Sequence, residues 1–175
     1  IRDASDDRIH IVRLESTGVY TEIGDTDTKG STYATATDGT QLYLVTNQNG
    51  ITVKRFDGSV WVTSNMENLN FAEMAATCKQ GTLFVLASTD KTSLYRYDVT
   101  ADAFAQEGVS LDSYSSSQTI CTEGGTLYVA YKRQSDAKLI VKKKSVTVTP
   151  APEPNPDPGT NPDPGTNPDP GTNPD

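Results

Sequence analysis

The strongest constraint on the fold is a short turn-and-strand unit that occurs three times. The copies begin at Gly39, Gly81 and Gly125, and each glycine is followed by threonine and an apolar run with an aromatic residue. The glycines are 42 and then 44 residues apart. Self-similarity at such a period is the sequence signature of a repeat architecture. The chain is therefore predicted to repeat one β unit.

Each repeat is predicted to hold four short strands. A strand of small residues precedes the Gly-Thr unit, and a hairpin of β-branched and aromatic residues follows it. The small-residue strands are 32–36, 73–78 and 117–121. The predicted hairpins are 51–56 with 60–63, 94–98 with 104–106, and 139–142 with 145–148, and a matching hairpin, 9–14 with 19–23, opens the chain. Small side chains predict that the first strand of each unit lies in a crowded place.

Four strands in about 40–45 residues are typical of one propeller blade. Over residues 1–149 the chain resembles β-propeller proteins of the kelch-like and sialidase-like kind. The segment 57–61, Asp-Gly-Ser-Val-Trp, is similar to the sialidase Asp-box but lacks its residue between Asp and Gly and its Thr before Trp. The Gly-His…Trp-Asp signature of WD repeats is absent from the sequence. The resemblance implies an all-β fold of about three and a half four-stranded antiparallel blades.

A closed propeller uses four to eight blades, and an open arc would expose strand edges. We therefore expect either the C-terminal part of a longer propeller or two copies of the chain closing one seven-bladed ring. The first is favoured because the sequence begins within a blade and without methionine. The alternative fold is a β-sandwich or a pair of small β domains, which regular strand spacing also fits. The self-similarity argues against that alternative.

The composition changes abruptly at Pro150. All ten prolines lie in 150–175, whereas every aromatic residue, both cysteines and every Lys and Arg lie in 1–149. From Asn155 the sequence repeats Asn-Pro-Asp-Pro-Gly-Thr, which predicts an extended, polyproline-II-like spacer. A Pro-rich ligand for a recognition domain is the alternative, but the tail lacks apolar or basic anchors. Such tails resemble the linkers of bacterial surface proteins, which implies an extracellular location.

Charge and hydropathy exclude several classes of partner. The net charge is −8, and five acidic residues lie in the tail, which leaves 18 acidic against 15 basic residues in 1–149. This balance offers no electrostatic footprint for nucleic acid. No apolar run approaches the ~20 residues of a membrane helix, so no membrane insertion is predicted.

Few residues suggest a metal or cofactor, and none is predicted. His10 is the only histidine, and Cys78 and Cys121 are too few for a zinc site or a disulfide framework. Two buried free thiols are expected, with a disulfide as the alternative. Asp25 and Asp27 have the spacing of some calcium loops, but Lys29 stands where an oxygen ligand is required, which favours an ordinary turn.

Aromatic residues are the candidates for a ligand surface. A sugar- or protein-binding face could use the aromatic side chains of Trp61, Tyr95, Tyr97, Tyr114 and Tyr131. Packing between sheets is the competing interpretation, above all for Trp61. The run Lys142-Lys143-Lys144 is explained by protection of a strand edge as well as by binding.

No catalytic set is found, and the chain is predicted not to be an enzyme. A sialidase-like site would need an arginine triad, but Arg13, Arg55 and Arg96 fall at matching repeat positions, which indicates solvated strand faces. The function expected is a non-enzymatic extracellular module that binds a protein or carbohydrate ligand on a cell-surface spacer. The alternatives are a fragment of a glycan-active enzyme and a structural element of a surface assembly.

Overall fold

The protein is all-β. The computed structural model describes residues 8–23, 28–29, 32–47, 50–66 and 69–147. This part of the chain contains strands β1 to β14 and no helix. It therefore has no helix that could cross a membrane. The predicted tail and the pair Asp25 and Asp27 lie outside the described residues.

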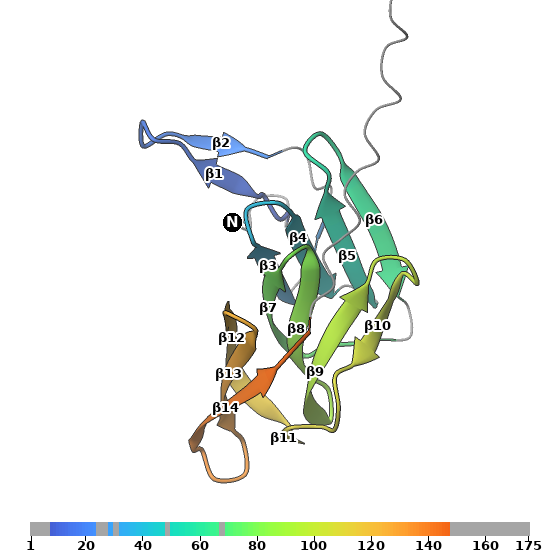
Figure 1. Ribbon diagram of the computed structural model, residues 1–175, viewed down its shortest axis with the longest axis vertical. Helices are drawn as coiled ribbons and strands as arrows, with labels where there is room; N and C mark the ends of the chain where they lie inside the picture. The colour runs from blue at the N-terminus through green and yellow to red at the C-terminus, as the bar shows by residue number, and fades with distance from the viewer. Residues whose placement is uncertain (1–7, 24–27, 30–31, 48–49, 67–68, 148–175) are drawn as a thin grey trace, which may run out of the picture.

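The strands form four antiparallel sheets, numbered here along the chain (Figure 1). Sheet 1 is the hairpin of β1 (Val12–Leu14) and β2 (Tyr20–Glu22). Sheet 2 contains β3 (Thr32–Thr37), β4 (Leu42–Asn47), β5 (Ile51–Phe56) and β6 (Trp61–Met66). Sheet 3 contains β7 (Glu73–Lys79), β8 (Thr82–Ser88), β9 (Lys91–Asp98) and β10 (Ala103–Gln106), and β11 (Asp112–Ser113) also pairs with β9. Sheet 4 contains β12 (Ser115–Glu123), β13 (Thr126–Arg133) and β14 (Leu139–Ser145).

The predicted repeat is confirmed at the level of strand order. Each small-residue strand pairs with the Gly-Thr strand after it, and the strand order within sheets 2 and 3 follows the chain. The predicted hairpins around 57–58 and 99–102, and the hairpin at the start, all form.

One predicted strand is wrong. Residues 145–148 were expected to form a separate partner for 139–142, but β14 runs without a break to Ser145, which pairs with Thr126. Val146 donates its N–H to the Gly125 carbonyl at 2.9 Å and thereby extends the same pairing. Within the described residues sheet 4 therefore has three strands. The Lys142–Lys144 run lies inside β14 and not at its end.

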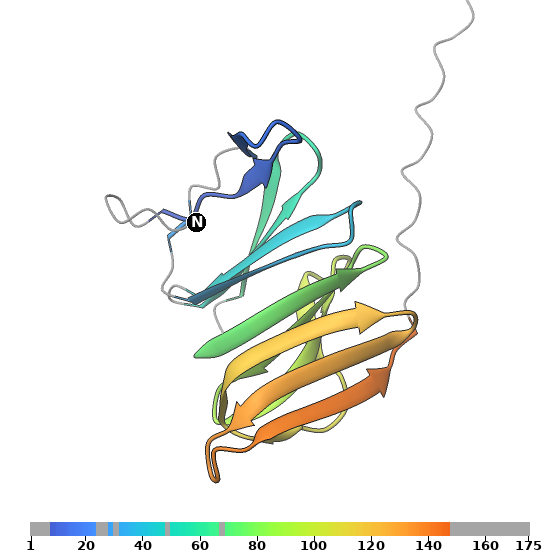
Figure 2. The same ribbon diagram turned by 90° about the vertical axis from the view of Figure 1, so that its left-hand side faces the viewer.

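The sheets are stacked in the order of the chain, with their first strands side by side. Figure 2 shows β3, β7 and β12 running across the same side of the molecule, and β7 contacts both of the others. Small residues such as Ala34, Ala36 and Ala75 allow this close approach. The described sheets form an open stack and not a closed ring.

The core consists of two layers, one on each side of sheet 3. Alternate residues of a strand point to opposite faces. Along β8, Leu83 and Val85 pack against sheet 2, and Phe84 and Leu86 pack against sheet 4. All four are fully buried, so β8 is apolar on both faces. The continuous apolar run after Gly81 is explained by its place in the middle of the stack.

A polar contact joins sheets 2 and 3 at the far end of these strands. The Asp38 carboxylate accepts a hydrogen bond from the Gly81 N–H at 2.6 Å. The Tyr43 hydroxyl donates to the Gly81 carbonyl, also at 2.6 Å. The backbone N–H and carbonyl of one buried residue, Gly81, are thus both satisfied by the neighbouring sheet. Burial raises the pKa of Tyr43 to about 12, so this hydroxyl remains a donor.

Candidate functional site

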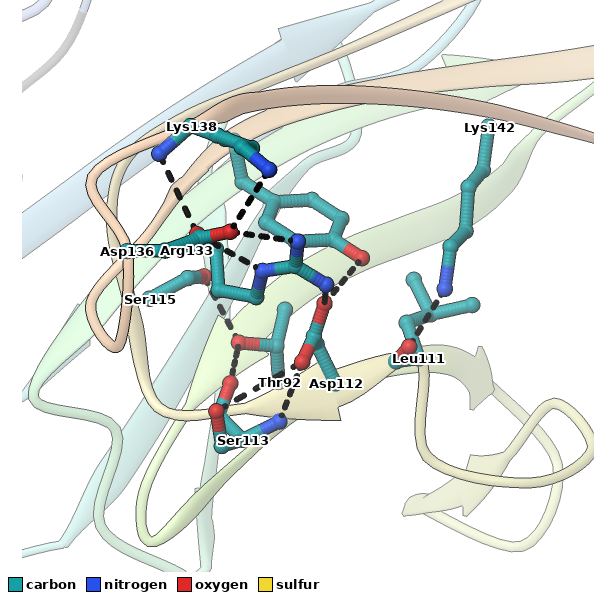
Figure 3. A network of polar contacts seen from close by, with 10 residues as sticks. Thr92, Leu111, Asp112, Ser113, Ser115, Arg133, Asp136, Lys138 and Lys142 are labelled. Carbon is teal, nitrogen blue, oxygen red and sulfur yellow. Dashed lines mark hydrogen bonds and ion pairs between the residues drawn. The ribbon is translucent and has the colours of Figure 1, made fainter.

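The candidate site lies where β12 begins, at the junction of sheets 3 and 4. We call Ser88, Thr92, Ser115 and Gln118 the β12 edge. Three of these residues are hydroxyl-bearing and completely buried. Ser88 ends β8. Thr92 lies near the start of β9, and Ser115 opens β12 (Figure 3). Three strands from two sheets thus contribute hydroxyls to one point.

The hydroxyls form a continuous hydrogen-bond cluster. Thr92 Oγ1 lies 2.6 Å from Ser115 Oγ and 2.9 Å from the Ser113 carbonyl oxygen. Ser88 Oγ lies 2.9 Å from Thr92 Oγ1 and 3.3 Å from Ser115 Oγ. A buried hydroxyl without a partner would cost about 1–3 kcal/mol, so mutual bonding keeps this junction stable.

Gln118 connects the cluster to the surface. Its Nε2 donates to Ser88 Oγ at 2.5 Å, which fixes the orientation of the side-chain amide. The Gln118 Oε1 atom is buried and has no hydrogen-bond partner among the residues that the structure describes. Buried acceptors are normally satisfied, and an exception requires an explanation. The amide thus leaves one buried acceptor unsatisfied, and a molecule from outside would reach it only by displacing the atoms that cover it.

The backbone of β12 is irregular at the same place. The pairing with β13 shifts register between Ser116 and Thr119, which is a β-bulge. Ser117 adopts a φ of +53°, in the left-handed region that non-glycine residues rarely enter. Strained residues persist only where their surroundings determine them, and they are concentrated at functional sites. The bulge turns Gln118 toward the hydroxyl cluster.

A group of charged residues adjoins the β12 edge (Figure 3). Arg133 ends β13 and contacts the Asp136 carboxylate through Nε at 2.9 Å and Nη2 at 2.8 Å. The second terminal nitrogen, Nη1, lies 3.5 Å from Asp112 Oδ2. Lys138 Nζ lies 3.5 Å from Asp136. The Arg133 guanidinium therefore joins β11, the β13–β14 turn and the end of β13.

The electrostatics of this group favour permanent charges over proton transfer. The hydrogen bonds from Arg133 hold the pKa of the Asp136 carboxyl well below its usual range. The same contact raises the pKa of Arg133. A general acid at neutral pH needs a raised pKa. Asp136 is therefore suited to accept hydrogen bonds and not to donate a proton.

The structure does not bring the five predicted aromatic residues together. Tyr97 and Tyr131 are buried, and Trp61, Tyr95 and Tyr114 are half-buried. Tyr97 donates to Asp102 at 2.6 Å and lies 3.0 Å from Ser64 Oγ of sheet 2. Trp61 donates its indole N–H to the Ile23 carbonyl at 3.0 Å. These two residues link neighbouring sheets.

Tyr114 and Tyr131 belong to the candidate site in different ways. Tyr114 precedes Ser115, and its carbonyl accepts a bond from the Gln134 N–H at 3.4 Å. The Tyr131 hydroxyl lies below the charged group, 3.4 Å from Asp112 Oδ2, and supports it from within. Tyr114 is therefore the one predicted aromatic residue that flanks the β12 edge at the surface. Sequence reasoning missed Gln118 and Arg133, and the serines at 113 and 115–117 were the only signal of a polar junction.

The structure also locates the cysteines and lysines that the sequence singles out. The two cysteines are free, which excludes the disulfide, and Cys121 is exposed although two buried thiols were expected. Lys144 binds Glu107 across sheets at 2.9 Å, and Lys142 donates to the Leu111 carbonyl. Within the described part of the chain, no group of three or more His, Cys, Asp and Glu side chains could hold a metal ion.

Comparison with known proteins does not assign the chain to a family. No protein-family model matches it, and no curated protein matches it.

Proposed function

We propose that the chain is a propeller-type arc of repeats that serves as an extracellular, non-enzymatic binding module. In this proposal the four sheets are successive blades, and the repeat in strand order supports it. The acidic, proline-rich tail supports a bacterial surface location, where it would act as a spacer. The ligand is a protein or a carbohydrate that presents hydrogen-bond donors.

The observation that carries the proposal is the unpartnered Gln118 Oε1 atom at the strained bulge. Close to Gln118 in the chain are Ser113 and Ser117, both exposed, and the half-buried Tyr114. A rigid amide, hydroxyls and an aromatic ring are the groups that recognise a polar ligand. The supporting contacts from Ser88 fix the geometry before binding, which lowers the entropic cost of association.

The ion pairs beside the β12 edge support binding over catalysis. Arg133 is occupied by Asp136 and Asp112, so these carboxylates are held as acceptors. Glycoside hydrolysis by two carboxyl groups requires one of them to remain protonated near neutral pH. The pKa of Asp136 is shifted in the opposite direction.

The test uses the full 175-residue chain on immobilised panels of neutral oligosaccharides, acidic oligosaccharides and unmodified proteins. Gln118→Ala should weaken binding of any probe that the wild type retains by about tenfold. Gln106→Ala is the matched control, because Gln106 lies on β10 and its side chain bonds only to the nearby Gly108 carbonyl in the described structure. Thermal unfolding of both variants separates lost binding from lost folding.

Two results would contradict the proposal. One is binding that is equally strong in wild type and Gln118→Ala, which would place the ligand elsewhere. The other is release of cleaved sugar from the oligosaccharide panel, which would identify a glycan-active enzyme.

Backbone amide shifts of Tyr114 and Gln118 in NMR spectra of the wild type, recorded with the bound probe, locate the ligand without any substitution.

A further inference from the structure

The outer face of sheet 4 carries the residue pattern of a sheet–sheet interface. Sheets 2 and 3 each turn one face toward the next sheet along the chain, and strand register identifies the equivalent positions on sheet 4. Paired residues on neighbouring antiparallel strands lie on the same face. The equivalent residues are Tyr43, Val45 and Val53 in sheet 2, Phe84, Leu86 and Leu94 in sheet 3, and Tyr128, Ala130 and Val141 in sheet 4. The pattern of an aromatic residue followed by smaller apolar residues is kept in all three.

These positions differ in what covers them. In sheets 2 and 3 the residues are at most 2% exposed, because the next sheet packs on them. In sheet 4 the exposed fraction of Val141 is 66%, and that of Leu139 beside it is 73%. We call Cys121, Tyr128, Ala130, Leu139 and Val141 the open face. No other described segment lies over the open face.

The opposite end of the stack carries the complementary half of the same interface. In sheet 3, Tyr97 pairs with Phe104, and both pack back against sheet 2. In sheet 2 the equivalent pair is Phe56 and Trp61, and Trp61 reaches back to Ile23 beside sheet 1.

Sheet 1 repeats this pair at the same position before its hairpin turn. The residues are Leu14 and Tyr20, which are directly opposite each other. They are 60% and 65% exposed, because no described sheet precedes them.

We infer that the open face of one copy of this chain binds the β1–β2 hairpin of a second copy, head to tail. The internal interface shows how the halves would meet, since Tyr43 contacts Tyr97 edge to face with ring centroids 6.4 Å apart. In the proposed contact Tyr128 takes the place of Tyr43, and Leu14 takes the place of Tyr97.

Charge agrees with this choice of partner. Lys143 lies on the same face of β14 as Val141 and is exposed. Glu22 lies on the same face of β2 as Tyr20 and is also exposed, with one carboxylate oxygen 2.7 Å from His10 Nδ1. The same chain thus supplies an apolar pair beside a carboxylate and an apolar face beside an ammonium. A head-to-tail contact of this kind closes into a ring or continues as a chain of subunits.

Sedimentation velocity of the full chain, at concentrations up to about 100 µM, tests the inference. The wild type should form dimers or larger assemblies, and Val141→Lys should raise the dissociation constant by about tenfold or more. Val109→Lys is the matched control, because Val109 is 85% exposed on a loop away from the open face. This control should leave the dissociation constant unchanged.

A second measurement uses the exposed Cys121 thiol, which lies within the open face, whereas Cys78 is buried. Its labelling by a maleimide should slow as protein concentration rises, and Val141→Lys should abolish this protection. The double variant Leu14→Glu with Val141→Lys should regain association, because the two new charges meet only in the head-to-tail arrangement. A wild type that remains monomeric at about 100 µM overturns the inference. Association that Val141→Lys leaves intact, or a double variant that stays as weak as Val141→Lys, also overturns it.

Discussion

Replacing Asp38 with asparagine should remove the hydrogen bond that Asp38 makes to the neighbouring sheet and keep the hydrogen bonds that it makes within its own turn. The Asp38 Oδ1 atom accepts bonds from the Thr40 N–H at 3.0 Å and the Gln41 N–H at 3.1 Å, both within its own hairpin. The Oδ2 atom accepts the bond from the Gly81 N–H of sheet 3 at 2.6 Å. Asparagine keeps one acceptor oxygen for the turn, but it places an NH₂ group opposite the Gly81 donor. The contact between sheets is therefore lost selectively.

The size of the effect follows from that single bond. A hydrogen bond to a charged group contributes about 1.5–3 kcal/mol, and partial exposure of Asp38 reduces this. We expect Asp38→Asn to lower the free energy of unfolding by about 1–2 kcal/mol. For a folded body of this size that corresponds to a fall in Tm of roughly 3–8 °C.

Two other aspartates provide matched controls. Asp57 and Asp98 each accept two backbone N–H bonds within their own turns, at 2.8–3.0 Å, and neither is seen bonding to another sheet. Asp57→Asn and Asp98→Asn should change the free energy of unfolding by less than about 0.5 kcal/mol. Urea unfolding followed by Trp61 fluorescence measures all three variants. If Asp38→Asn is as harmless as the two controls, the contact with Gly81 does not stabilise the stack.

The pH dependence of the same variant has a defined sign. Burial alone would raise the pKa of Asp38, but the bonds from Gly81, Thr40 and Gln41 hold it well below the ordinary value of 3.8. A depressed pKa in the folded state contributes stability above the unfolded pKa, and that stability is lost as pH falls. The difference in unfolding free energy between wild type and Asp38→Asn should be constant from pH 7 to about pH 5 and should shrink below about pH 4. A difference that shrinks between pH 7 and pH 5 would contradict this assignment.

Three further substitutions or probes test the packing. Leu86→Ala should lower the free energy of unfolding by about 2–5 kcal/mol in urea titrations, because Leu86 is fully buried between sheets 3 and 4. Tyr97→Phe should cost about 1 kcal/mol by the same measurement, through loss of its bonds to Asp102 and Ser64. Mass spectrometry after iodoacetamide treatment should find native labelling at Cys121 only, since burial, together with the neighbouring Asp38 carboxylate, raises the pKa of the Cys78 thiol to about 12.

The strand order could be predicted because glycine turns and apolar runs are local signals. The face of the sheet to which each side chain points could not be predicted, because side chains alternate along a strand and a shift of one residue moves every side chain to the opposite face. Counting from the glycines aligns Tyr43 with Val85, but packing aligns Tyr43 with Phe84. The turn between β3 and β4 is longer than the turn between β7 and β8, since Thr37 pairs with Leu42 whereas Lys79 pairs with Thr82.

The candidate site was less predictable than the fold. The chemistry of aromatic side chains makes them candidate ligand contacts, but their exposure cannot be read from the sequence. Tyr97 and Tyr131 are in fact buried. Gln118 carries no motif, and its importance comes from a bulge that depends on tertiary packing against Ser88. The sequence explains the lysine run by edge protection as well as by binding, and it gives no sign that Lys144 bonds across to Glu107. Such partners are distant in sequence, and only the stacking of the sheets brings them together.

The β12 edge and the open face should act independently, although both include residues of β12. Gln118 points toward sheet 3, where it bonds to Ser88, whereas Cys121 lies on the opposite, outer face of β12. Surfaces with no shared partners contribute additively to measured free energies. Val141→Lys should therefore weaken self-association without changing ligand affinity, and Gln118→Ala should do the reverse. Titration of a bound probe into wild type, both single variants and the double variant measures the coupling. A coupling above about 0.5 kcal/mol would mean that the second copy contributes to the ligand site.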